Sequence, residues 1–291
     1  MVPEIAVTHF TDPACPFAYS SIPAFTVLRW RYGDQLRWRL VTIGLSESTE
    51  QYEARGYTPA RAALGAAHFR RYGMPFLVAP RERMVATSPA CRAIVATRLL
   101  QPGREHDALR SLQLAWFTTS LLLDEPKAIR EALAGAGGLD VEAIVNAIDD
   151  ETTLGAYEQD KAETRTAEGG PTHFQGRARQ TDGPVRYSAP SLVMELDGRR
   201  LEGGGFQPVE AYDVLIANLD TGLDRRPPAE NPSEALEAFP EGLVTQEVAA
   251  VMAHNNMEPD RAAAERALLE LVASGAVRRT TLGNDALWQL A

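Results

Sequence analysis

The first forty residues pass from a strand-like hydrophobic pattern to a helix-like one and back. Apolar and polar positions alternate over residues 4–10, and they alternate again over residues 36–43, after the turn signal Gly33-Asp34. Between these segments, apolar residues recur at roughly helical spacing as far as Arg31. This order predicts a β-α-β unit in which a helix crosses between two parallel strands.

Helical patterns then dominate to residue 167 before strands return. We expect helices over residues 58–72, 89–100, 104–123, 126–135 and 139–167, the last broken near Asp149 and Asp150. The glycine- and proline-rich segment 169–184 predicts an irregular, mobile flap. Strands are expected at 191–196 and 199–202 around the turn Asp197-Gly198, followed by a helix that ends near Leu219.

The remaining residues predict a separate, smaller unit. Residues 223–232 are rich in proline and indicate a linker. Three helical patterns follow, over residues 234–239, 245–254 and 259–274, and then two strands, 276–280 and 286–290, around a turn. We therefore expect a domain at 1–222 with a helical insertion at about 50–167, and a small α+β, winged-helix-like domain at 233–291.

Charge and length narrow the range of partners. The chain has 291 residues and a net charge of −10, which disfavours nucleic acid as the main partner, because phosphate binding needs a concentrated basic surface. Acidic residues also outnumber the four arginines of the C-terminal domain, so we interpret it as a protein-binding or homodimerisation module. No apolar run approaches a membrane span, and residues 1–4 do not begin a secretory signal, so we expect a cytoplasmic protein without membrane contact.

Cys15 is the most informative residue for chemistry, because it stands where the first strand gives way to the first helix. Unpaired backbone N–H groups and the positive end of the helix dipole favour a thiolate there, which predicts a nucleophilic cysteine with a lowered pKa. Pro16 suits the first helical position, where no hydrogen-bond donor is needed. The alternative interpretation is a buried small hydrophobe in a site that has lost catalysis.

The other cysteine and the histidines indicate little chemistry by themselves. Cys15 and Cys91 alone cannot build a disulfide scaffold or a thiolate-rich zinc site. His9, His68 and His173 have no metal-ligand spacing, so we expect no metal.

The segment around Cys15 resembles the active site of a known group of proteins. It is similar to the Cys-Pro-x-Cys segment of the DsbA group of the thioredoxin fold, especially the cytosolic FrnE-like members, with Ala18 at the second cysteine position. It is also similar to the Ser-Pro-Tyr-Ala-Tyr segment of kappa-class glutathione transferases and 2-hydroxychromene-2-carboxylate isomerases, whose serine binds the glutathione sulfur. Residues 189–212 resemble the same region of FrnE-like proteins. The segment around Cys15 reads Asp12-Pro13-Ala14-Cys15-Pro16-Phe17-Ala18-Tyr19.

The resemblance covers about three quarters of the chain, and it implies an α/β thioredoxin fold with a DsbA-like helical insertion. It implies a cis peptide bond at Ala189-Pro190 beside Cys15, which is the expected catalytic residue. Cys91 is either a distant resolving thiol or, as we prefer, core packing. The groove residues it implies are Pro16, Phe17, Ala18, Tyr19, Ala189, Pro190, Ser191 and, from the insertion, Arg92.

Three functions follow from these observations. The first is a thiol-disulfide oxidoreductase whose single cysteine forms mixed disulfides with a small thiol or a protein client. Because Ala18 removes the usual resolving thiol, an external thiol would have to complete the exchange. The second is a transferase or isomerase that uses glutathione or another small thiol, with no tightly bound cofactor. The third is a redox-inactive binding adaptor.

Overall fold

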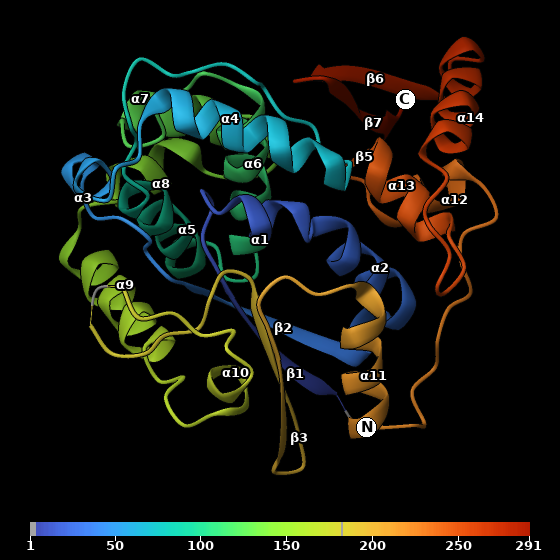
Figure 1. Ribbon diagram of the computed structural model, residues 1–291. Helices are drawn as coiled ribbons and strands as arrows, with labels where there is room; N and C mark the ends of the chain where they lie inside the picture. The colour runs from blue at the N-terminus through green and yellow to red at the C-terminus, as the bar shows by residue number, and fades with distance from the viewer. Residues whose placement is uncertain (1–3, 182) are drawn as a thin grey trace.

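A four-stranded sheet forms the centre of the larger part of the chain in the computed structural model, which describes residues 4–181 and 183–291 (Figure 1). Strand β1 (Ile5–Thr11) runs parallel to β2 (Leu36–Thr42) and antiparallel to β3 (Ser191–Leu196), which pairs with β4 (Arg199–Gly204). The strand order is β2-β1-β3-β4. Asp197 and Gly198 both have positive φ, so the predicted Asp-Gly turn closes the β3-β4 hairpin.

The predicted first helix is two helices, α1 (Pro16–Ser20) and α2 (Ile22–Tyr32). Proline lacks the N–H group that would continue the ladder, and Pro23 lies in the first turn of α2, which explains the break at Ser21. Helix α11 (Val209–Leu219) packs beside α2, and the two helices share one hydrophobic core with the sheet. The β-α-β opening and the closing β-β-α unit therefore meet around one sheet.

The helical insertion forms a second core beside β2. The insertion contains the predicted helices and one further helix, α3, which the sequence pattern did not indicate. The predicted break near Asp149 and Asp150 falls between α8 and α9. The helices are α3 (Thr49–Ala54), α4 (Pro59–Phe69), α5 (Ser88–Leu100), α6 (Glu105–Thr118), α7 (Pro126–Leu133), α8 (Val141–Asn146) and α9 (Glu151–Thr164).

The segment after α9 is not wholly irregular, which corrects the prediction for residues 169–184. Helix α10 (Pro171–Phe174) lies against β4. The backbone N–H and the hydroxyl of Thr172 both donate to Glu202 Oε2, over 3.0 and 2.7 Å. A buried glutamate thus anchors this turn of helix to the sheet.

The C-terminal part contains the expected helices and hairpin. Its elements are α12 (Pro232–Ala238), β5 (Leu243–Val244), α13 (Thr245–Met252), α14 (Arg261–Ala273), β6 (Val277–Leu282) and β7 (Asp285–Leu290). Strand β5, too short for a sequence signal, completes a three-stranded antiparallel sheet in the order β5-β7-β6. The winged-helix interpretation stays a prediction.

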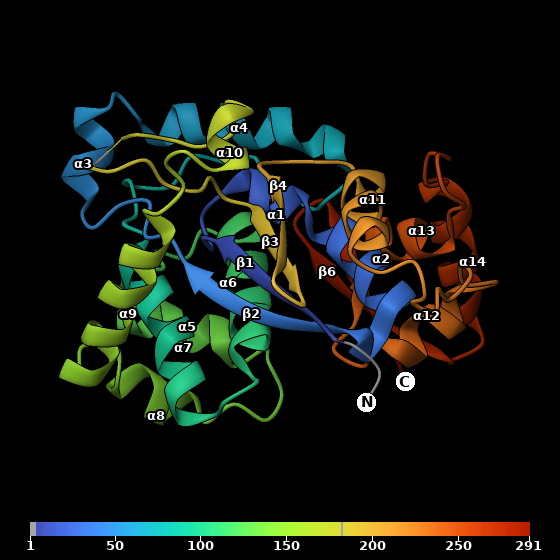
Figure 2. The same cartoon turned by 90° about the horizontal axis from the view of Figure 1, so that it is seen from below.

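The C-terminal part packs directly on the first domain (Figure 2). Val27 and Trp30 of α2 belong to its hydrophobic core. The connecting segment follows α2 as well, because Arg226 N donates to Arg31 O over 2.9 Å and Trp30 Nε1 donates to Pro227 O over 2.7 Å. The predicted linker is therefore bound along α2.

Candidate functional site

Cys15 caps the N-terminus of α1, as the sequence pattern predicts. Its backbone is extended, with φ −80° and ψ 115°, and Pro16 is the first residue of the helix. The side chain is 7% exposed, and its thiol donates to the carbonyl oxygen of Ala189 over 3.2 Å. The Ala189-Pro190 peptide bond is cis. The sheet thus brings the helix-start cysteine against the residue that precedes a cis-proline, 174 positions away.

A buried carboxyl group, Asp12, lies under this site, and the sequence analysis did not assign it a role. Its Oδ1 accepts from Ala14 N over 2.9 Å, and its Oδ2 accepts from Leu45 N over 2.9 Å and from Thr87 Oγ1 over 3.1 Å. Cys91 Sγ lies 3.5 Å from the same oxygen. Burial raises the pKa of Asp12.

The predicted lowering of the Cys15 pKa is wrong for this geometry. Burial raises the pKa of the thiol to about 11, and the Asp12 carboxylate adds to the rise. The backbone N–H groups of Phe17 and Ala18 act in the predicted direction, but their effect is smaller than the loss of hydration. Cys15 is therefore a protonated thiol and a hydrogen-bond donor at neutral pH.

Cys91 is fully buried on α5, where it packs with Val95 and Tyr157. Burial also raises its pKa, with a further contribution from Asp12. Both cysteines are free thiols, and Cys91 directs its Sγ to Asp12. These contacts favour the core-packing interpretation over the resolving thiol.

Helix α3 brings a second unforeseen group to the site. Tyr52 lies close enough to Asp12, Cys15 and Cys91 for all three to raise the pKa of its hydroxyl, although burial is the largest cause. Its ring contacts Tyr57 edge to face, with the ring centroids 5.5 Å apart. Tyr52 is thus a protonated hydroxyl within electrostatic range of both thiols. No motif points to it, because α3 gave no recognisable periodicity.

The two aromatic residues of the motif have different environments. Phe17 is 44% exposed and packs against Phe69 and Phe206, with ring centroids 4.8 and 5.9 Å away. Tyr19 is fully buried, stacks on Phe117 and donates its hydroxyl to Pro75 O over 2.9 Å. Phe17 therefore fits the predicted groove, but Tyr19 is part of the packing between α1 and the insertion.

Of the remaining predicted groove residues, some lie at the Cys15 site and others are held in contacts elsewhere. Pro16 is half-buried, and Ala18 is buried in the same cluster as Cys15 and Ala189. Ser191 is buried, and its hydroxyl donates to Ser188 O over 2.7 Å, so its side chain supports the loop before β3. Arg92 forms an ion pair with Asp149 over 3.0 Å. The structure thus commits Arg92 to the α8-α9 junction rather than to the groove.

The histidines do not converge on Cys15. His9 is buried on β1 against Phe25, His68 contacts Phe69, and His173 Nδ1 accepts from Gly169 N over 3.0 Å. Residues 4–181 and 183–291 contain no group of three or more histidine, cysteine or acidic side chains arranged to hold a metal ion. In the same residues, no helix is both long enough and apolar enough to cross a bilayer.

Solved structures share this architecture at low sequence identity. The cytosolic disulfide reductase DsbM from Pseudomonas aeruginosa is 18% identical, with a TM-score of 0.51 over 75% of this chain and 100% of DsbM. The probable DsbA oxidoreductase SCO1869 from Streptomyces coelicolor is 17% identical, with a TM-score of 0.54 over 78% of this chain and 93% of that protein. No protein-family model and no curated protein matches the sequence. The chain has a DsbA-like thioredoxin fold with a helical insertion.

Proposed function

We propose that this protein is a thiol-disulfide oxidoreductase in which Cys15 is the single exchanging thiol. One observation carries the proposal: the thiol of Cys15 begins a helix and contacts the carbonyl oxygen of Ala189, directly before cis-Pro190. An extended peptide could pair with the backbone beside Pro190, which would place a client disulfide next to Sγ. The shared fold with disulfide oxidoreductases supports this assignment.

The exchange has two stages. Cys15 loses its proton and attacks one sulfur of the client disulfide, which forms a mixed disulfide and releases the other client sulfur as a thiolate that takes up a proton. A small thiol then attacks Cys15 Sγ and frees the client thiol, and a second small thiol restores Cys15 as the small-molecule disulfide is released. Glutathione is our candidate, because DsbM has also been solved with GSH. A cytoplasmic location belongs to this proposal, since only a thiol-rich compartment supplies the reductant.

Burial makes this chemistry slow in the geometry described. With a pKa of about 11, the thiolate fraction at pH 7 is only about 10⁻⁴. A client that replaces the thiol as the partner of Ala189 O would release Sγ from its hydrogen bond. We propose that Tyr52 then donates its hydroxyl hydrogen to the displaced sulfur and so favours the anion.

The test is to locate the adduct. We would incubate the protein with oxidised glutathione and map the products by mass spectrometry, with Cys15→Ser and Cys91→Ser as paired variants. The proposal expects a glutathione adduct on Cys15 that Cys91→Ser retains and Cys15→Ser abolishes. The absence of any Cys15 adduct, even at alkaline pH, would contradict it and leave the transferase or the redox-inactive adaptor.

A transferase or isomerase is the second candidate, and the protonated state of Cys15 favours it. A neutral thiol can donate a hydrogen bond to the sulfur of a bound small thiolate without attacking it, as the serine of the similar segment does. The two functions differ in what Cys15→Ser does. Serine can replace a hydrogen-bond donor but not a nucleophile, so activity that survives Cys15→Ser would select the transferase class.

We retain a protein-binding role for the C-terminal part as a proposal. Its face toward α2 is occupied within the chain, so a client, a partner or a second copy would bind its outer face. Arg261 forms an ion pair with Asp285 over 2.9 Å, which reduces the charge available for phosphate.

A further inference from the structure

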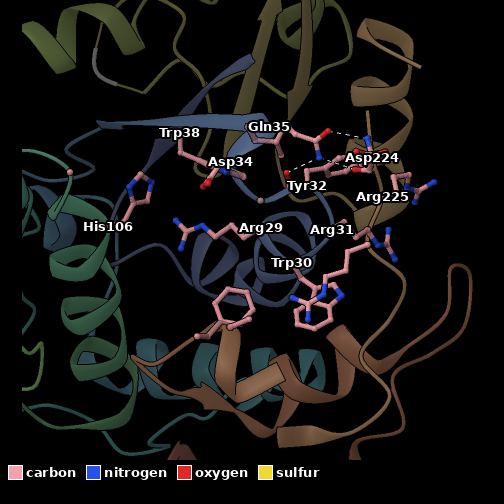
Figure 3. A pocket seen from close by; sticks show the side chains of 16 residues that line it. Arg29, Trp30, Arg31, Tyr32, Asp34, Gln35, Trp38, His106, Asp224 and Arg225 are labelled. Atoms are coloured by element: carbon pink, nitrogen blue, oxygen red, sulfur yellow. Dashed lines mark hydrogen bonds between the residues drawn. The ribbon is translucent and has the colours of Figure 1, made fainter. Parts of the chain in front are cut away.

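A large cavity lies where α2, β2 and α6 meet the C-terminal part (Figure 3). Its volume is about 880 Å³, within the range of small-molecule sites. A second, narrow cavity shares Arg29, Trp38, His106 and Phe239 with it and is also lined by His9 and Ala18. Cys15 is not among the lining residues of either cavity.

Three residues that line these walls each have a buried nitrogen atom without a hydrogen-bond partner. They are His9 Nε2, Trp38 Nε1 and His106 Nε2. His9 is only 5% exposed, and Trp38 can act only as a donor. Buried polar atoms without a partner are rare in folded proteins, because each costs on the order of 1–3 kcal/mol. A ligand that reached these atoms would supply an acceptor to Trp38 Nε1 and a hydrogen-bond partner to each histidine nitrogen.

Arg29 contributes a positive charge to this site. Of its neighbours in the cavity wall, Arg226 pairs with Glu234, whereas Arg31 and Arg225 share the single carboxylate of Asp213 and keep one net positive charge. Within residues 4–181 and 183–291, no carboxylate lies within ion-pair distance of Arg29, whose guanidinium sits 5.5 Å from the centre of the Trp38 ring. Figure 3 shows Arg29 and His106 pointing toward each other across the space, with Trp38 beside them.

Acidic groups also lie near this cavity. Glu241 lines the narrow part and Asp34 and Asp224 line the wide part, while Glu247 is neutralised by Arg110 over 2.8 Å. Burial lowers the pKa of His9 to about 3 and that of His106 well below its usual value, so neither is a cation at neutral pH. A ligand beside Arg29 would therefore meet its guanidinium group and neutral imidazole rings.

We propose that this cavity binds a small molecule through an oxyanion group, a carboxylate or a phosphate, which Arg29, Trp38 Nε1 and the two histidines hold together. Guanidinium groups bind both kinds of oxyanion through charge-assisted hydrogen bonds. The site does not depend on the thiol chemistry proposed for Cys15.

The experiment titrates the intact protein with inorganic phosphate and with succinate, by calorimetry and by thermal unfolding at constant ionic strength. Glycerol at equal concentration is the neutral control. At least one anion should bind and raise the unfolding temperature, since a ligand of the native state stabilises it. Binding of phosphate alone or of succinate alone identifies which oxyanion the site takes.

Two variants connect binding to the named atoms. Arg29→Gln should weaken binding about 10- to 100-fold without lowering the unfolding temperature of the free protein, because it removes a charge that has no partner. Trp38→Phe keeps the ring, loses the N–H donor and should weaken binding several-fold. Arg37→Gln is the matched control, because Arg37 is exposed and pairs with the exposed Glu4. The proposal is overturned if neither anion exceeds glycerol, or if Arg29→Gln binds as the native chain does.

Discussion

Two buried carboxylates, Asp12 and Glu247, have opposite environments in this chain. Glu247 lies where α13 meets α2 and α6, and it accepts from both terminal nitrogens of Arg110, from Thr26 Oγ1 and from Val244 N. Asp12 is equally buried and also accepts several hydrogen bonds, but every donor that contacts it is neutral. Among the residues that the structure describes, Asp12 has no cationic hydrogen-bond partner, and this distinguishes it from Glu247.

That difference assigns the two groups different roles. A compensated ion pair fixes how two parts of the chain fit together, because either charge alone in the interior is costly. A buried carboxyl group that accepts only from neutral donors has a raised pKa, and here it adds to the rise that burial causes in the pKa of Cys15 and of Cys91. The C-terminal interface thus contains a paired buried charge, whereas the Cys15 region contains a buried carboxyl group with neutral donors.

We expect the largest change in stability from a substitution where the C-terminal part contacts α2 and α6. Glu247→Gln would leave Arg110 without its counter-charge and should lower the free energy of unfolding by about 3 kcal/mol. Denaturant unfolding measures this change. The exposed Glu258→Gln is the control and should stay near the native value. A change below about 1 kcal/mol for Glu247→Gln would show that the pair does not hold the C-terminal part in place.

At the other region, Ala18→Cys should have the largest effect on activity. A second thiol one helical turn after Cys15 can attack a mixed disulfide intramolecularly, so we expect disulfide reductase turnover to rise about tenfold or more. The lifetime of a Cys15 adduct, measured by quenched mass spectrometry, should shorten accordingly. If turnover and lifetime both stay unchanged, the oxidoreductase assignment gives way to the transferase or the adaptor.

Asp12→Asn tests whether the carboxyl controls the thiol. The rate of iodoacetamide alkylation of Cys15 should have its midpoint near pH 11 in the native chain, and removing the carboxylate should move this midpoint to lower pH. Asp150→Asn, an exposed control, should leave it in place. A native midpoint at or below about 8.5 would show that burial does not dominate.

Asp12→Asn should also change how the free energy of unfolding depends on pH. Because the folded pKa of Asp12 is raised, its protonated form stabilises the native state fully below the unfolded pKa of about 3.9. That contribution to stability is lost as the pH rises toward and through the pKa of Asp12 in the folded state. Relative to Asp12→Asn, the native chain should therefore lose stability from about pH 4 upward. Unfolding free energies measured as a function of pH check the sign.

Cys91→Ser should have the smallest effect. Serine preserves a donor to Asp12 and most of the side-chain volume, so we expect little change in the lifetime of a Cys15 adduct. If this variant instead trapped the adduct, Cys91 would be the distant resolving thiol. Adduct decay followed in parallel for the native chain and the variant decides between the two interpretations.

The sequence alone determined the order of elements and the position of Cys15. Alternation in the strands, the Asp-Gly turn and the start of a helix at Pro16 are local signals, because neighbouring residues produce them. They predicted the four strands of the central sheet and most helices of the insertion, whereas the position of Cys15 beside Pro190 was implied only by the resemblance. They missed α3 and β5, which are too short to show a period.

Tertiary structure alone decided the electrostatics. The sequence placed Cys15 at a helix dipole and predicted a thiolate, but burial reverses that result, and burial depends on chain segments far from the motif. The same holds for Asp12, Tyr52 and the cavity around Arg29, whose neighbours come from distant elements. Hydration and charge compensation are properties of the assembled interior, so no local pattern of residues encodes them.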